Sequence, residues 1–173
     1  MHSTRKYLAA VLLAIMAASL ISCSPEKREK AFKRKLIEVA KEYISRQLRN
    51  PETHVLNDST VMLGDSTRRY FIQPSQVHAG LIDDDDRMDG IVSVTSMSRT
   101  GGVMNEHLII LDTGGKLMMV RSVESDMKIL SIRDRIITAD LPTHPANNPL
   151  HNCPVCIVAV RYRFRNGDLE KTD

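Results

Sequence analysis

The fold class is decided by residues 107–123, HLIILDTGGKLMMVRSV. Two short apolar runs, 107–111 and 117–123, flank Asp112-Thr113-Gly114-Gly115, which contains the residue types that favour tight turns. A connection this short leaves no room for a crossover helix, so the two runs are expected to pair as antiparallel strands.

The same pattern extends from residue 60 to the end of the chain. Short apolar runs occupy 61–63, 69–72, 91–97, 107–111, 117–123, 127–132, 135–141 and 156–164. Turn-forming pairs separate them, and Asn166-Gly167 is a strong signal for a hairpin that joins the last run to a short strand near Leu169. We therefore predict an antiparallel β-meander of about seven strands.

The segment before the strands has helical periodicity from about Glu26 to Arg49. Its apolar residues fall within half of the helical circumference: Phe32, Leu36, Ile37, Val39, Ala40, Tyr43, Ile44 and Leu48. Charged residues occupy the other half, and Asn50-Pro51 is expected to end the helix. The predicted fold class is therefore α+β, with one N-terminal amphipathic helix packed on the meander in a single domain over residues 26–173.

Basic charge is concentrated in the predicted helix. Residues 26–49 contain nine Lys or Arg and four Glu, whereas residues 50–173 contain thirteen Lys or Arg and seventeen Asp or Glu. The basic helix face is either solvated or lies on the phosphates of an anionic membrane. Aromatic residues make up only 4% of the chain, so we expect no platform on which bases or sugars would stack.

The last long apolar run carries a row of arginines. Val158, Val160, Tyr162 and Phe164 point to one face of the strand, and Ala159, Arg161, Arg163 and Arg165 point to the other. The arginine row either grips an anionic partner, such as a phosphate or a sulfated glycan, or is the solvated face of a half-buried strand.

The N-terminus has the three parts of a secretory signal. Arg5 and Lys6 form a charged region, an apolar run extends over 7–20, and the small residue Ser22 precedes a cleavage position. The apolar run is shorter than the about 20 residues that a membrane-spanning helix needs. We predict a signal peptide over residues 1–22, and export of the chain argues against nucleic acid as a partner.

The end of this signal, Leu20-Ile21-Ser22-Cys23, resembles the lipobox of bacterial lipoproteins. The resemblance implies that the mature chain begins at Cys23, that Cys23 carries three acyl chains, palmitate among them, and that residues 23–25 are a lipidated tether. Ser24 stands where an aspartate would favour retention in the inner membrane, so the resemblance implies the outer membrane. Three acyl chains exceed the two signals that stable anchoring requires.

An acidic segment, Asp83-Asp84-Asp85-Asp86-Arg87-Met88-Asp89-Gly90, directly precedes an apolar run. Ca²⁺ prefers several oxygen ligands from a flexible turn. The segment resembles the Asp-rich turns of FG-GAP and VCBS-type β modules, which implies calcium ligands at Asp83, Asp85 and Asp89. Leu81 occupies the first ligand position of that pattern, so a solvated acidic turn is the alternative.

Two cysteines remain after the lipidated Cys23, in His151-Asn152-Cys153-Pro154-Val155-Cys156. Their even number and an oxidising compartment favour a disulfide between Cys153 and Cys156. Zinc is a second interpretation, with His151 and His144 as further ligands, although this spacing is loose. Thiol–disulfide catalysis is a third, and the strand that follows the pair disfavours it, since such thiols usually sit at a helix N-terminus.

Val61-Met62-Leu63-Gly64-Asp65-Ser66 resembles the first block of GDSL esterases, in which an apolar strand ends at a nucleophilic serine. The resemblance implies Ser66 as nucleophile, and Asp140 with His144 as the remaining members of a triad. Three residues separate Asp140 from His144, where the family has two, and an antiparallel meander would not present the triad geometry.

Taken together, these features resemble small uncharacterised lipoproteins of Gram-negative envelopes, a resemblance that implies no particular activity. The leading hypothesis is a lipid-anchored envelope protein that acts as a non-catalytic binding or assembly module for an envelope protein or a glycan. The alternative is a lipid-anchored GDSL-like esterase using Ser66 and His144. No cofactor is expected beyond a possible calcium ion or, less favoured, zinc.

Overall fold

The computed structural model describes residues 24–56, 60–144, 153 and 156–172. The chain divides into two compact units, Met1–Phe32 and Lys33–Asp173, and every described strand belongs to the second unit. Among the described helical residues, no helix is long and apolar enough to cross a membrane. The signal peptide and Cys23 lie outside the described residues, so the cleavage and the lipidation stay predictions.

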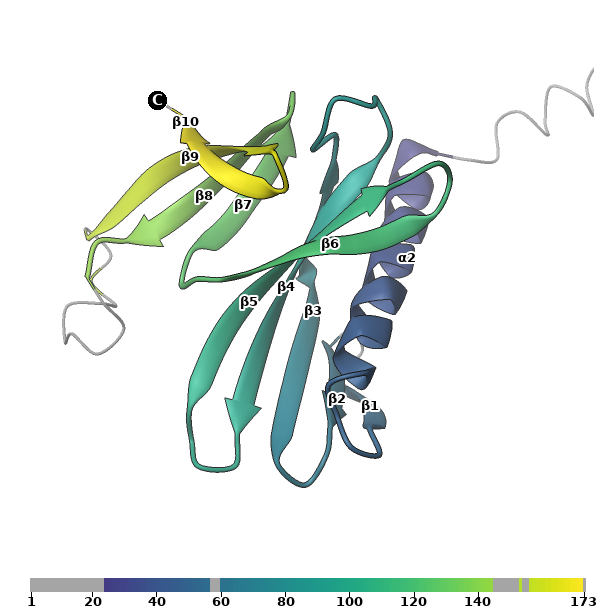
Figure 1. Cartoon of the computed structure of the whole chain (residues 1–173), viewed down its shortest axis with the longest axis vertical. Coiled ribbons are helices and arrows are strands. Elements are labelled where there is room, and N and C mark those ends of the chain that lie inside the picture. Colours follow the sequence, from purple (N-terminus) through teal and green to yellow (C-terminus); the bar gives the residue numbers. More distant parts are fainter. Residues whose placement is uncertain (1–23, 57–59, 145–152, 154–155, 173) are drawn as a thin grey trace, which may run out of the picture. The chain divides into compact units, whose positions relative to one another are not determined.

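The described residues are mostly β structure, in two antiparallel sheets with one helix (Figure 1). The first sheet has the order β1-β2-β3-β4-β5-β6, formed by β1 (Glu52–Leu56), β2 (Thr60–Gly64), β3 (Arg68–Gly80), β4 (Asp89–Ser98), β5 (Val103–Asp112) and β6 (Leu117–Glu124). The second sheet has the order β10-β9-β8-β7, formed by β7 (Lys128–Arg133), β8 (Ile136–Pro142), β9 (Ile157–Arg165) and β10 (Asp168–Thr172).

The antiparallel prediction is confirmed, but the prediction of about seven strands in one meander was wrong. One unpredicted strand is β1, whose five residues are all exposed and therefore show no apolar alternation. Its backbone nevertheless pairs along its whole length with β2, from Glu52 opposite Gly64 to Leu56 opposite Thr60. Backbone pairing can thus define an edge strand that burial does not mark.

The meander breaks between β6 and β7. The N–H of Ser125 donates to the carbonyl of Asn105 at 3.2 Å, and the N–H of Met127 donates to Ser125 Oγ at 3.2 Å. These bonds turn the chain so that β7 packs against β3 instead of pairing with β6. The two sheets approach closely at Gly80, where an added Cβ would lie 2.7 Å from Ile132 Cγ2.

Residues of both sheets share one apolar core. Its buried members are Ile82, Ile91, Ile109, Leu111, Met127, Ile129, Ile132, Ile137, Ala139 and Val160. The second sheet therefore covers part of the first, and this burial explains why the chain starts a new sheet instead of extending the old one.

The helix, α2 (Pro25–Ser45), begins one residue before its predicted start and ends four residues before its predicted end. At its start, the N–H of Lys27 donates to the carbonyl of Ser24 at 3.0 Å, and proline is favoured at the first helical position. At its end, the N–H of Gln47 turns back to the carbonyl of Ile44 at 2.9 Å. The N–H of Arg49 donates to Asp65 at 2.9 Å, so this segment is a turn and not helix.

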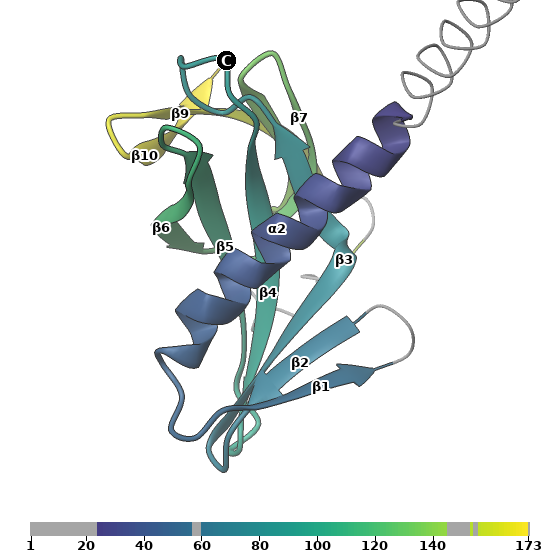
Figure 2. The same ribbon diagram turned by 90° about the vertical axis from the view of Figure 1, so that its right-hand side faces the viewer.

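The part of α2 after Phe32 lies across one face of the six-stranded sheet (Figure 2). Leu36, Ile37, Ala40 and Ile44 are buried there, and all four belong to the predicted apolar face. An added Cβ at Gly90 of β4 would lie 2.2 Å from Leu36 Cδ1, so this glycine permits the close approach of helix and sheet.

The predicted hairpin between the last two strands is confirmed. Asn166 and Gly167 have φ angles of 54° and 81°, as the two central residues of a type I′ turn require. The turn pairs β9 with β10, with Phe164 opposite Leu169. Val160 is buried, and Tyr162 and Phe164 pack against the core, which places the arginines of β9 on the outer face, as the alternation predicted.

Candidate functional site

The acidic loop between β3 and β4 brings together the three aspartates that the sequence singles out. Oxygen atoms of Asp83, Asp85 and Asp89 all lie within 4.8 Å of one another. Asp85 is exposed, Asp83 is half-buried and Asp89 is buried at the start of β4. This grouping has the donor chemistry that a hard cation prefers.

Both carboxylate oxygens of Asp89 are already engaged. Oδ2 accepts the N–H groups of Ile82 at 2.9 Å and Asp83 at 3.4 Å, and Oδ1 accepts the N–H of Asp112 at 2.9 Å. The side chain thus ties the acidic loop to the end of β5. Burial raises the pKa of Asp89, and the three N–H donors partly oppose that rise.

Two arginines place fixed positive charge on the same loop. Arg135, from the turn between β7 and β8, donates from Nε to the carbonyl of Asp83 at 2.7 Å and also pairs with Asp84 and Asp86. Arg87 lies 3.9 Å from carboxylate oxygens of both Asp85 and Asp112. Much of the attraction that a bound cation would supply therefore comes from guanidinium groups of the chain itself.

The loop fits Ca²⁺ only in part. Asp83, Asp85 and Asp89 supply three of the roughly six to eight oxygens that Ca²⁺ requires. Burial raises the pKa of Asp83 as well, so its negative charge is not fully compensated by its surroundings. Calcium binding stays a prediction, and backbone carbonyls or solvent would have to complete the ligand set.

A backbone hydrogen bond joins the two cysteines ahead of β9. The N–H of Cys156 donates to the carbonyl of Cys153 at 3.0 Å, and the carbonyl of Cys156 accepts from both N and Oγ1 of Thr143, at 2.8 and 2.9 Å. Both side chains are thiols in the structure, and hydrogen bonding with Cys153 raises the pKa of the Cys156 thiol. His151 lies outside the described residues, so the disulfide and the zinc interpretation stay predictions.

The Gly-Asp-Ser segment forms the turn between β2 and β3. Asp65 Oδ1 accepts from Thr67 N and Oγ1, both at 2.7 Å, and from Arg68 N at 3.0 Å, while Oδ2 accepts from Arg49 N at 2.9 Å. These hydrogen bonds, led by the one from the Thr67 hydroxyl, hold the pKa of Asp65 well below its usual range. The turn chemistry of Asp65 accounts for this motif without any catalytic role.

Within the part of the chain that the structure describes, the proposed nucleophile is not hydrogen-bonded to a histidine. Ser66 is exposed in this turn of the first sheet, whereas His144 follows β8 of the second sheet. Among the described residues, no hydrogen bond connects Ser66 with any histidine, although a serine nucleophile is activated by such a bond. The geometry therefore offers no support for the esterase alternative.

A serine–histidine pair that the sequence analysis missed lies inside the molecule. Ser93 of β4 and His107 of β5 are direct cross-strand partners, with Oγ 2.8 Å from Nδ1. His107 Nε2 lies 3.2 Å from the carbonyl of Ser125, which can only accept, so Nε2 carries the proton and Ser93 Oγ donates to Nδ1. His107 is only 2% exposed, and this burial lowers its pKa.

Ser93 is 8% exposed, and both residues line a cavity of about 230 Å³. Each residue satisfies a polar group of the other, and the Ser125 carbonyl satisfies the remaining ring nitrogen. The only signal in the sequence was a polar residue, Ser93 or His107, in each of two largely apolar runs. The register that places the two opposite each other cannot be read from that signal.

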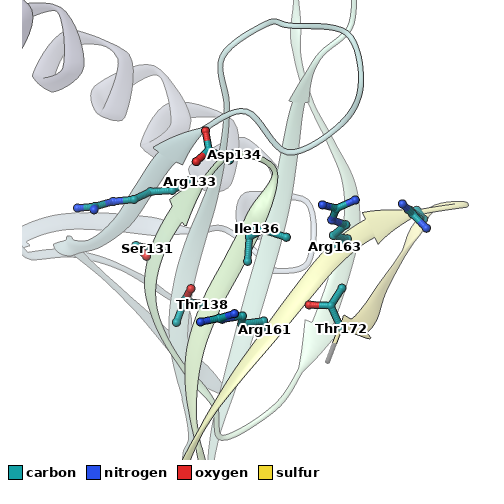
Figure 3. A pocket seen from close by; sticks show the side chains of 9 residues that line it. Ser131, Arg133, Asp134, Ile136, Thr138, Arg161, Arg163 and Thr172 are labelled. Carbon is teal, nitrogen blue, oxygen red and sulfur yellow. The ribbon is translucent and has the colours of Figure 1, made fainter.

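An open hollow lies on the outer face of the four-stranded sheet. Its volume is about 600 Å³, and its lining residues are Ser131, Arg133, Asp134, Ile136, Thr138, Arg161, Arg163, Arg165 and Thr172. We call it the arginine hollow. Figure 3 shows Arg161 between Thr138 and Thr172, which are its register partners on β8 and β10.

The side chains of these four arginines make no hydrogen bond or ion pair with any described residue. Some other arginines of the chain do have partners: Arg46 pairs with Glu42, Arg121 with Asp168 at 3.1 Å, and Arg135 with the acidic loop. Other guanidinium groups without such a partner, among them those of Arg69 and Arg99, also lie on the described surface, but the arginine hollow gathers four, three of them at alternate positions of one strand.

The chain matches no protein-family model, no curated protein and no solved structure.

Proposed function

We propose that this chain is a lipid-anchored protein of a bacterial envelope, held at the outer membrane through Cys23, that acts as a non-catalytic binding or assembly module. The anchor rests on the lipobox resemblance of residues 20–23. The binding role rests mainly on one observation, the arginine hollow.

Two features of the hollow favour docking over chemistry. It is open and spreads over four strands, and it holds no nucleophile paired with a base among its lining residues. The polar groups that resemble catalytic machinery elsewhere have structural partners, since Asp65 accepts turn N–H groups and His107 bonds a backbone carbonyl. A surface of this kind suits recognition of a partner in the envelope.

Photo-crosslinking in cells tests the binding role. Ala159 is exposed and shares the outer face of β9 with the arginines, so a photoreactive residue placed there would contact a docked partner. The expected result is a discrete crosslinked adduct from position 159 and none from Val55 of β1, which is also exposed. The same diffuse pattern from both positions would contradict the proposal.

Esterase activity would contradict the non-catalytic part of the proposal. The full-length protein is expected to hydrolyse p-nitrophenyl butyrate no faster than its Ser66→Ala variant. A rate that falls at least about 100-fold on this substitution would assign Ser66 as a nucleophile and overturn the proposal.

A further inference from the structure

The arginine hollow has a charge arrangement that specifies the class of its ligand. Arg161, Arg163 and Arg165 alternate along β9, so neighbouring arginines are about 6.6–6.8 Å apart along the strand and the row extends over about 13 Å. Arg133 lines the same hollow from β7, which is two strands away from β9 in the sheet. One small anion would contact only part of this row.

The carboxylates near the hollow do not form ion pairs with these arginines. Asp134 lines the hollow, and Glu170 lies opposite Arg163 in the register of β9 and β10. In the described part of the chain, however, no carboxylate oxygen lies within 4.0 Å of a guanidinium nitrogen of the four arginines. Glu170 instead accepts from Asn166 Nδ2, at 3.5 Å.

The neighbours of Arg161 supply further donors. Thr138 and Thr172 are its partners on the adjacent strands, and both line the hollow. Thr172 Oγ1 is buried and has no hydrogen-bond partner among the described residues. A buried hydroxyl without a partner is costly, so an acceptor oxygen in the hollow would be favoured beside it.

Guanidinium groups and hydroxyls in one hollow match tetrahedral oxyanions. Arginine presents a planar fork of N–H donors that binds phosphate oxygens in pairs, and like charges lining a cleft focus the field on an incoming anion. The hollow has no aromatic lining residue on which a base or sugar ring would stack, so recognition would depend on charge and its spacing.

We propose that the arginine hollow binds a ligand that carries at least two phosphate or sulfate groups, with Arg161 and Arg163 as its principal contacts. This inference rests on the proposed binding function and names the ligand class of that same surface.

Calorimetric titration of the mature lipidated protein in a non-ionic detergent tests the proposal. The probes are inorganic phosphate, sodium tripolyphosphate and a heparin-derived tetrasaccharide. We expect at least one of the two polyanions to bind about tenfold or more tightly than inorganic phosphate, because several arginines then act together. Which polyanion binds identifies phosphate or sulfate as the preferred group.

Two double variants locate the site. Arg161→Gln/Arg163→Gln is expected to weaken polyanion binding by about tenfold or more, since it removes the central contacts. Arg34→Gln/Arg49→Gln removes the same charge from exposed positions outside the hollow and is expected to change the affinity less than about twofold. Thermal unfolding of each variant checks that the fold is kept.

Failure of the ligand assignment and failure of the binding function give different results. No binding of either polyanion, or equal weakening by both double variants, overturns the ligand assignment. If a crosslinked adduct at position 159 persists in that case, the binding function still stands with a partner of other chemistry.

Discussion

At the scale of single residues, two carboxylates show how this chain uses aspartate. Asp65 and Asp89 both accept several backbone N–H groups, but Asp65 is near solvent and Asp89 is buried. The pKa of Asp65 is lowered by its hydrogen bonds, whereas burial raises that of Asp89. The same residue type therefore contributes to stability with opposite dependence on pH.

Asp65 leads to a prediction on acid stability. Its pKa in the folded chain lies below the value of about 3.9 expected in the unfolded chain, so its contribution is present above pH 4 and is lost as the pH falls further. Asp65→Asn keeps an acceptor oxygen for Thr67 and Arg68 but does not titrate. We expect its free energy of unfolding, measured in urea, to fall less steeply than that of the wild type below pH 4.

The exposed Asp126, whose side chain accepts no hydrogen bond from the described residues, offers a matched control. Asp126→Asn is expected to keep the steep acid dependence of the wild type. If the free energy of unfolding of Asp65→Asn falls as steeply with pH as that of the wild type, the ionisation of Asp65 does not contribute to the acid dependence of stability.

At the scale of elements, the sequence predicted those features of the strands that depend only on residues close together in the chain. The alternation in 156–164 located the buried and exposed faces of β9, and Asn166-Gly167 located its hairpin, because both depend on backbone geometry within a few residues. The start of a second sheet at β7 depends on packing against β3, which is distant in sequence and has no local signal.

The candidate sites divide in the same way. The grouping of Asp83, Asp85 and Asp89 was predictable, because all three belong to one short loop. The arginine hollow was predicted only as a row on one strand. Arg133 and Thr172 reach it from β7 and β10 through strand pairing, and that pairing cannot be derived from their own sequence neighbourhoods.

The acidic loop leads to a prediction on calcium. Raised pKa values of Asp83 and Asp89 mean that their negative charge costs stability at neutral pH, and a bound cation would relieve that cost. We therefore expect millimolar Ca²⁺ to raise the melting temperature by mass action. Asp85→Asn should remove the rise, since Asp85 is the exposed member of the group and its substitution leaves the N–H bonds to Asp89 in place.

Asp84 provides the control for this experiment, because it belongs to the same loop but not to the group of three. Asp84→Asn should retain the response to Ca²⁺. A wild-type melting temperature that does not change with Ca²⁺ leaves the solvated acidic turn, neutralised by Arg87 and Arg135, as the better description.

The cysteine turn leads to a prediction on covalent structure. The N–H of Cys156 already donates to the carbonyl of Cys153, and we expect a disulfide between the two residues in the mature protein. Such a short loop limits the entropic stabilisation to about 2 kcal/mol, so reduction should loosen the segment before β9 without unfolding the sheets. Mass spectrometry under non-reducing conditions, with and without alkylation, measures the state of the two thiols.

Zinc would give a different result in the same preparation. The metal would appear in elemental analysis, and a chelator rather than a reductant would release the segment. Two alkylatable thiols without bound zinc would exclude both interpretations.

At the scale of the whole molecule, the proposed function depends on the N-terminus as much as on the sheets. The anchor would hold the protein on a membrane surface where phosphate groups are concentrated, so that even a weak anion-binding hollow would be occupied often. The charge distribution agrees with an anchored N-terminus, since the basic residues concentrate in 26–49, next to the anchor, and residues 50–173 carry excess acidic charge. The arginine hollow is a local exception within this acidic part.

The last prediction concerns the anchor itself. Metabolic labelling with a palmitate analogue should tag the protein, and Cys23→Ser should abolish the label and release the chain from the membrane fraction, because one residue carries all of the acyl chains. Cys156→Ser, which removes a cysteine of the mature domain, should keep both the label and the membrane location. Ser24→Asp should keep the label and move the protein from the outer to the inner membrane, as the lipobox resemblance implies. A label that persists in Cys23→Ser would contradict the anchor, and the chain would then have to reach its partner without a membrane to concentrate it.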